Sequence, residues 1–209
     1  MPSKNELKES ILPIWKVVTL AKKCFRYAFY LHKPDTEIEL EFLERSREFT
    51  FIRHILWRNT VIELSKLFSS SPKRDKYNIF HFINKLKKDQ YFGTFEIDPS
   101  KIKTWEEQLE MNSSTINIIL ELRDKVYAHT DNEKAKSNLD TPTFEQTEKL
   151  LNIVEGVIQE IYATVFDGYA EMESPTVKET PEKIIKILAK EKKNRIDAIH
   201  KGLKSKTTK

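Results

Sequence analysis

Glycine and cysteine are both scarce in this chain of 209 residues. The shortage of glycine bears on the fold class, and the shortage of cysteine bears on disulfides and the cellular compartment. Only four glycines are present, and no stretch alternates apolar and polar residues in the way typical of a β-strand. The single cysteine, Cys24, excludes an intramolecular disulfide and fits a reducing compartment. Long amphipathic runs rich in Leu, Ile, Lys and Glu fill most of the chain instead. The sequence therefore predicts an all-α protein.

The chain also lacks the apolar segments that target proteins to membranes or anchor them there. Its first six residues are polar, so we expect no secretory signal. No apolar run approaches the roughly 20 residues of a membrane-spanning helix. We therefore expect a cytoplasmic protein with no membrane partner.

The net charge of +4 is unevenly distributed along the chain. Residues 174–209 contain eleven Lys and Arg residues against four Asp and Glu residues, whereas the preceding body is slightly acidic. A basic appendage of this kind suits contacts with nucleic-acid phosphates, but it is also typical of a solvated, lysine-rich tail. This segment can dock on the body, on a partner protein or on RNA, and the sequence leaves these three alternatives open.

Apolar residues recur at helical spacing in segments that turn signals separate. Asp35 or Thr36 is expected to cap the second helix, and Ser113 or Ser114 the helix that contains Arg123. The later half of the second helix, residues 49–68, is apolar almost all round and is expected to be surrounded by neighbours. Besides the helix that contains Arg123, the predicted helices span residues 5–32, 37–69, 78–88, 98–111, 144–173 and 182–203.

These segments predict an up-and-down bundle of four to five main helices over residues 1–173. A linker and a basic amphipathic tail are predicted over residues 174–209. Patterns for several common chemistries are missing from both parts. No Glu stands three residues before a His, as di-iron bundles require, and neither His-Glu-x-x-His nor a cysteine pair occurs. The glycines are too scattered for a nucleotide-binding loop. We therefore expect no dedicated metal site and no cofactor.

The segment from Arg123 to His129 is the most informative part of the chain. Arg123 lies at the centre of the apolar stripe that Ile116 and Ile119 define, where a guanidinium needs a carboxylate, a phosphate or a water-filled cleft. His129 follows about 120° round the same helix, within its wider apolar arc. Two residues with anion-binding and proton-transfer chemistry on the buried side indicate a site. The alternative is a structural Arg beside a His that merely ends a helix.

Spacing alone does not distinguish this pair, because every histidine of the chain follows an arginine at a similar distance. The surrounding sequence does distinguish it, because Arg123 is central in its apolar stripe and is followed directly by an acid, Asp124. The other four pairs lie at a stripe edge, on a charged face, across a loop or in the basic tail, and they are Arg26/His32, Arg47/His54, Arg74/His81 and Arg195/His200.

An Arg and a His without a metal suit phosphodiester cleavage by an internal nucleophile. His129 can take the proton of an RNA 2′-hydroxyl or protonate the leaving 5′-oxygen, since its ordinary pKa is close to neutral. Arg123 can bind the phosphate with paired donors and stabilise the charge of the transition state. DNA lacks the 2′-hydroxyl, so this chemistry predicts activity on RNA only.

The run Arg123-Asp124-Lys125-Val126-Tyr127-Ala128-His129 resembles the R-x(4–6)-H motif of the HEPN superfamily, most closely its abortive-infection, AbiU-like branch. A second likeness is upstream: Glu63-Leu64-Ser65-Lys66-Leu67-Phe68, a short basic loop, and then Asn78-Ile79-Phe80 opening a helix. The branch often has Arg where this chain has Lys66. The resemblance covers roughly residues 5–172 and leaves the basic tail unmatched.

The resemblance implies a HEPN-like helical bundle that forms a homodimer, with the Arg/His pairs of two subunits facing one cleft. It implies a metal-independent ribonuclease of a toxin–antitoxin or anti-phage system, with RNA as substrate and an antitoxin or neighbouring protein as a possible partner. Catalytic roles fall to Arg123 and His129, and supporting roles to Asp124 and to Glu63, or less favourably Arg53 or Asn59. Glu63 can instead pair with Arg123 structurally. Other members of the superfamily bind RNA or proteins without cutting, so a silent binding module is the alternative.

Overall fold

The computed structural model describes residues 1–69, 76–127, 140–171 and 180–207, with side chains at all of these except 126–127 and 204–207. Every regular element in these ranges is helical, which confirms the all-α prediction. The longer helices are α1 (Lys4–His32), α3 (Arg47–Phe68), α5 (Pro99–Met111), α6 (Ser113–Leu122), α7 (Phe144–Val165) and α8 (Pro181–Thr207). The shorter elements are α2 (Glu37–Glu44), α4 (Ile79–Lys85), the 3-10 turn η2 (Gly93–Phe95) and the π-helical turn η3 (Arg123–Tyr127).

The chain divides into two compact units, and α1 and α3 contribute to both. One unit comprises Met1–Phe25 with Arg58–Glu173, and the other comprises Arg26–Trp57 with Ser174–Lys209. The two-part division at residue 173 that the sequence predicts stays a prediction, but α8 shares its unit with α2 and the start of α3.

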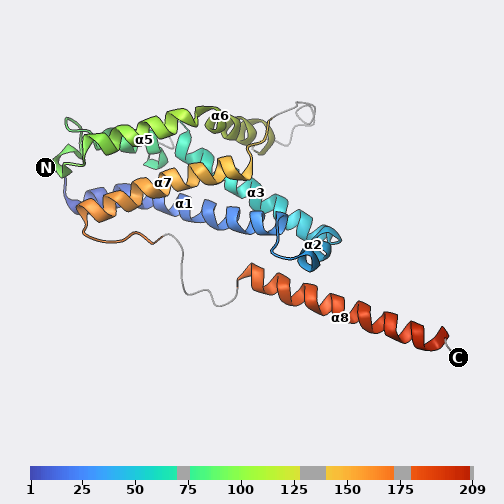
Figure 1. The fold of residues 1–209 in the computed structure, drawn as a ribbon. Coiled ribbons are helices and arrows are strands. Elements are labelled where there is room, and N and C mark those ends of the chain that lie inside the picture. Colours follow the sequence, from blue (N-terminus) through green and yellow to red (C-terminus); the bar gives the residue numbers. More distant parts are fainter. Residues whose placement is uncertain (70–75, 128–139, 172–179, 208–209) are drawn as a thin grey trace. The chain divides into compact units, whose positions relative to one another are not determined.

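In the first unit, α1 and α7 lie side by side and antiparallel (Figure 1). The ring of Trp15 meets that of Tyr162 edge-on with centroids 4.9 Å apart, and Phe25 meets Phe144, the first residue of α7, at 5.8 Å. Lys22 forms an ion pair with Glu155 between these contacts. As residue numbers rise along α1 they fall along α7, so the chain directions are opposed.

The core of this unit follows from helical spacing of apolar residues, each helix burying one face at intervals of three or four. From α1 and α7 it takes Leu7, Ile11, Ile14, Val18, Leu150, Val154, Val157, Ile158 and Ile161. From α3 to α6 it takes Val61, Leu64, Leu67, Ile79, Ile83, Ile102, Leu109, Ile116 and Ile119.

The second unit has its own small core, made by the end of α1, α2, the start of α3 and α8. Its buried members are Tyr30, Leu31, Leu43 and Ile185, against which Phe42, Phe49 and Leu56 pack. Helix α8 is therefore docked through its first half, so docking on the body is the outcome for that half of the predicted tail.

The sequence predicts capping residues for two helices, and the prediction for α2 is confirmed. Thr36 caps α2 in a capping box with Glu39, and Asp98 caps α5 by accepting a hydrogen bond from the Ser100 amide. The prediction for α6 was wrong by one residue, because the N-cap is Asn112, whose side chain makes no capping hydrogen bond.

The predicted single helix over residues 37–69 was wrong, because the chain breaks at Arg45 and Ser46. The Ser46 hydroxyl accepts a hydrogen bond from the Phe49 amide at 3.4 Å, as an N-cap does, so α3 starts afresh. The prediction that residues 49–68 are buried all round is also wrong for the first part of that range. Phe51 is 65% exposed and Ile52 41%, and full burial begins only at Thr60.

The predicted helix over residues 144–173 ends early, at Val165. Asp167 adopts the left-handed conformation with φ of 50°, and the amide of Gly168 donates back to the carbonyl of Tyr162 at 3.1 Å. Asp tolerates this backbone region better than most residues. The Asp-Gly dipeptide was the sequence signal for this stop.

Candidate functional site

Helix α6 carries the candidate site at its carboxyl end. Ile116, Ile119 and Leu122 are buried at intervals of three, which fixes the rotation of the helix about its axis. Arg123 follows directly at the point where α-helical hydrogen bonding ends, and its amide donates to the carbonyls of Ile119 and Leu120.

Arg123 is also the first residue of the π-helical turn that ends at Tyr127. Single π-turns are rare and occur often at functional sites. The turn coincides with the beginning of the Arg-to-His motif. It also corrects the prediction of a regular α-helix through this segment, because a turn with i to i+5 hydrogen bonds changes the angles that 3.6 residues per turn would give.

The side chain of Arg123 is only 16% exposed, which agrees with its place in the apolar stripe. Its Nε lies 2.6 Å from Oδ1 of Asp124, close enough for an ion pair. The same Nε is buried and has no hydrogen-bond partner among the described residues, so the contact is close but poorly aligned. A buried donor without an aligned acceptor is costly unless an anion approaches it.

Asp124 points away from the core and its side chain is 61% exposed. Its neighbour Lys125 pairs instead with Glu121, one turn earlier, at 3.2 Å. Asp124 is thus the acid nearest the Arg123 guanidinium, and it lies where solvent or a ligand can reach it. His129 is outside the described residues, so its assignment stays a prediction.

Glu63, the predicted supporting acid, lies on α3 with 13% of its side chain exposed. It pairs with Lys66 at 2.5 Å, and no ion pair joins it to Arg123 in the described part of the chain. Glu63 and Lys66 line a groove of about 400 Å³, together with Lys16 and Tyr77. Burial, and then the charge of Glu63, raise the pKa of the Cys24 thiol.

The two alternatives to Glu63 lie elsewhere on α3. Arg53 lines a groove of about 320 Å³ together with His32 and Phe49 in the second unit. Asn59 is exposed in the first unit. Neither has a described contact with Arg123, and their supporting roles stay predictions.

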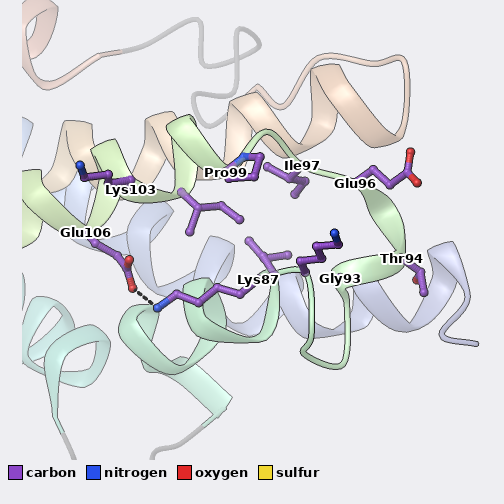
Figure 2. A pocket seen from close by; sticks show the side chains of 11 residues that line it. Lys87, Gly93, Thr94, Glu96, Ile97, Pro99, Lys103 and Glu106 are labelled. Carbon is purple, nitrogen blue, oxygen red and sulfur yellow. Dashed lines mark ion pairs between the residues drawn. The ribbon is translucent and has the colours of Figure 1, made fainter.

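A cleft of about 560 Å³ lies where the end of α4, η2 and the start of α5 meet (Figure 2). Its lining is largely apolar, and Lys87 and Glu106 form an ion pair of 2.7 Å at its edge. Nothing in the sequence pattern predicted this cleft, because its lining comes from the segment after α4, from η2 and from α5, which share no periodicity.

Two kinds of feature do not occur in the described ranges. No group of three or more His, Cys, Asp or Glu side chains is arranged to hold a metal ion there. No described helix is long and apolar enough to cross a membrane.

The comparison with protein families places the chain in a class and then in a family. It is a HEPN protein, as its helical fold and its Arg-to-His motif indicate. The family model described as AbiU2 matches residues 5–186, and the chain belongs to this HEPN family. The match extends past the predicted boundary at residue 173 into the first turns of α8. No curated protein and no solved structure gave a significant match.

Proposed function

We propose that this protein is a metal-independent endoribonuclease of a toxin–antitoxin or abortive-infection system, with Arg123 and His129 as its catalytic residues. RNA is its substrate, the working form is a homodimer, and an antitoxin or neighbouring protein restrains it in the cytoplasm. Asp124 supports Arg123, and Glu63 has a positioning role.

Membership of the HEPN AbiU2 family is the first support, because the motif of this superfamily falls on Arg123 and His129. The observation that carries the proposal is the setting of Arg123. A mostly buried guanidinium with an unaligned Nε stands at the first residue of a π-turn, six residues before the histidine of the motif. An approaching phosphate oxygen would provide the missing acceptor.

The chemistry needs one base, one acid and a cation. His129 takes the proton of the 2′-hydroxyl, and the 2′-oxygen then forms a bond to phosphorus while the bond to the 5′-oxygen breaks. Arg123 binds the non-bridging oxygens and stabilises their added charge. A second imidazole, from the other subunit, protonates the leaving 5′-oxygen. The products are a 2′,3′-cyclic phosphate and a 5′-hydroxyl.

The test is incubation of the purified protein with mixed cellular RNA in EDTA, followed by analysis of the new ends. We expect cleavage by the wild type and a loss of at least about a hundredfold in His129→Ala, the usual scale for a general acid or base. His54→Ala is the matched control, because His54 is exposed on α3 and its pair with Arg47 lies on a charged face, outside the apolar stripe that carries Arg123. Its rate should equal that of the wild type. Full activity in His129→Ala would contradict the proposal.

The second candidate is a silent HEPN module that binds RNA or a protein partner. The observation that favours it is the low exposure of the Arg123 side chain, 16%, with an acid of its own chain, Asp124, already within ion-pair distance. The replacement Arg123→Ala separates the two functions. It should abolish cleavage with little loss of stability if Arg123 is catalytic, and lower the free energy of unfolding in a protein that never cleaved RNA if Arg123 is structural.

A further inference from the structure

Helix α8 is anchored to the second unit through its first half. Arg26 Nε donates to Glu182 Oε1 at 3.1 Å, and the Tyr30 hydroxyl donates to the carbonyl of Glu182 at 3.4 Å. Ile185 and Ala189 are each 2% exposed, and Lys192 Nζ lies 5.3 Å from the ring centroid of Phe42 on α2. One face of α8 is thereby occupied.

A different face of α8 presents a row of lysines. Lys186, Lys190, Lys193 and Lys201 are all exposed, and none of them forms an ion pair with a described residue. At 100° per residue they cluster about 120° round the helix from the buried face, along roughly 22 Å of its length. Asp197 interrupts the row, and the exposed Lys183 extends it toward the start of the helix. Over the whole of α8, nine Lys and Arg residues oppose three acids.

The composition of this face decides what kind of surface it can bind. A helix that lies in a membrane surface needs a continuous apolar face, commonly with aromatic residues, and α8 contains no aromatic residue. The exposed apolar residues of α8 do not form such a face, because Glu191 and Arg195 separate Ile184, Ile187 and Leu188 from the exposed Ile199 and Leu203 further along the helix. Interfaces between proteins are depleted of lysine in their buried centres, so a row of lysines is not typical of a protein-binding surface.

A row of exposed lysines on one face of a helix matches a polyanion. Such a row neutralises phosphates and gains affinity by releasing their counterions, without reading bases. We propose that the lysine row of α8 binds the phosphate backbone of single-stranded RNA. The inference deepens the proposed function, on which its choice of RNA rests, by adding a surface that holds the substrate through charge alone.

The test measures binding of a fluorescein-labelled oligouridine to the full chain carrying His129→Ala, which keeps the probe intact. The test variant replaces Lys186, Lys190, Lys193 and Lys201 with Gln. The matched control makes the same four-charge change at exposed lysines outside α8, namely Lys8, Lys23, Lys88 and Lys149. Affinity is followed between about 50 and 200 mM salt, where phosphate contacts weaken steeply.

We expect the test variant to bind at least about tenfold more weakly at low salt, with a slope of log K against log salt that is flatter by up to about 3. The control should stay close to the parent protein. A deoxyuridine probe should show the same slope change, since phosphate contacts do not use the 2′-hydroxyl.

Equal losses in the two variants, unchanged binding in the test variant, or no binding by the parent would overturn the inference. So would a lysine-dependent affinity for vesicles of phosphatidylserine and phosphatidylcholine that exceeds the affinity for RNA. The readout is binding, so a failure of catalysis leaves it unaffected. Backbone binding without any cleavage by the wild type would remove the nuclease proposal and keep the lysine row as a nucleic-acid surface.

Discussion

At the scale of single residues, Arg123 combines a full positive charge with a mostly buried side chain, and Asp124 beside it satisfies that charge imperfectly. A structural arginine is ordinarily held by well-aligned acceptors, since an unpaired buried donor costs about 1–3 kcal/mol. Such a cost is tolerated where binding of a ligand relieves it. This reasoning links the geometry of one side chain to the proposal that a phosphate binds there.

Gly93 provides a residue-scale test of packing around the cleft of Figure 2. A Cβ at this position would lie 2.5 Å from the carbonyl oxygen of Lys87 and closer still to that of Lys88. Backbone atoms cannot move aside cheaply, so Gly93→Ala should lower the free energy of unfolding by about 1–3 kcal/mol. Urea denaturation measures the change.

Gly156 is the matched control for this substitution. It lies inside α7, where an added Cβ would meet nothing within 4 Å. Gly156→Ala should therefore raise the free energy of unfolding by about 0.5–1 kcal/mol, the helix preference of Ala over Gly. Equal effects at the two positions would show that the close approach at Gly93 is not present in solution.

At the scale of helices, the sequence predicted best where an apolar stripe ends at clear turn signals, as in α1 and α5. It failed where a local hydrogen bond interrupted a continuing stripe. The Ser46 hydroxyl separates α2 from α3, and the left-handed Asp167 stops α7, while the apolar pattern continues past both positions. The π-turn at Arg123 could not be predicted for a similar reason. The spacing of apolar residues does not show whether the backbone forms i to i+4 or i to i+5 hydrogen bonds.

The docking of α8 should depend on pH through Glu182. Burial opposes ionisation of this carboxyl, but hydrogen bonds from its own amide and from Thr180, with the charge of Arg26, bring its pKa below the ordinary 4.5. A carboxyl whose pKa is lowered on folding stabilises the folded state above its ordinary pKa, and the contribution disappears as the pH falls through the lowered value. As the pH falls below the ordinary pKa of 4.5, protection of the α8 amides from hydrogen exchange should therefore decrease.

The variant Glu182→Gln should lose this pH dependence and be less protected at neutral pH by about 1 kcal/mol or less, because Arg26 is half exposed. Glu191→Gln, an exposed change on the same helix, is the control and should retain the pH dependence. If protection between Ile185 and Ile196 is the same in all three proteins, the ion pair does not hold α8 in place.

At the scale of the whole molecule, the fold class and the family were accessible from sequence, because both depend on patterns that recur over many residues. The candidate site was accessible only in part. The motif identified Arg123 and Asp124, and the structure added the π-turn, the burial and the misaligned contact. Pairing of two subunits depends on surfaces that a single chain does not reveal, so the homodimer remains part of the proposal.

The central claim is that RNA is cut by attack of its own 2′-hydroxyl. Its most direct test uses an oligonucleotide that spans one cleavage site mapped in cellular RNA, with the ribose on the 5′ side of the cut bond replaced by deoxyribose. We predict that the all-ribose strand is cut in EDTA to give a cyclic phosphate, and that the single replacement abolishes cleavage at that bond alone. Cleavage of the substituted bond at an unchanged rate would contradict the account.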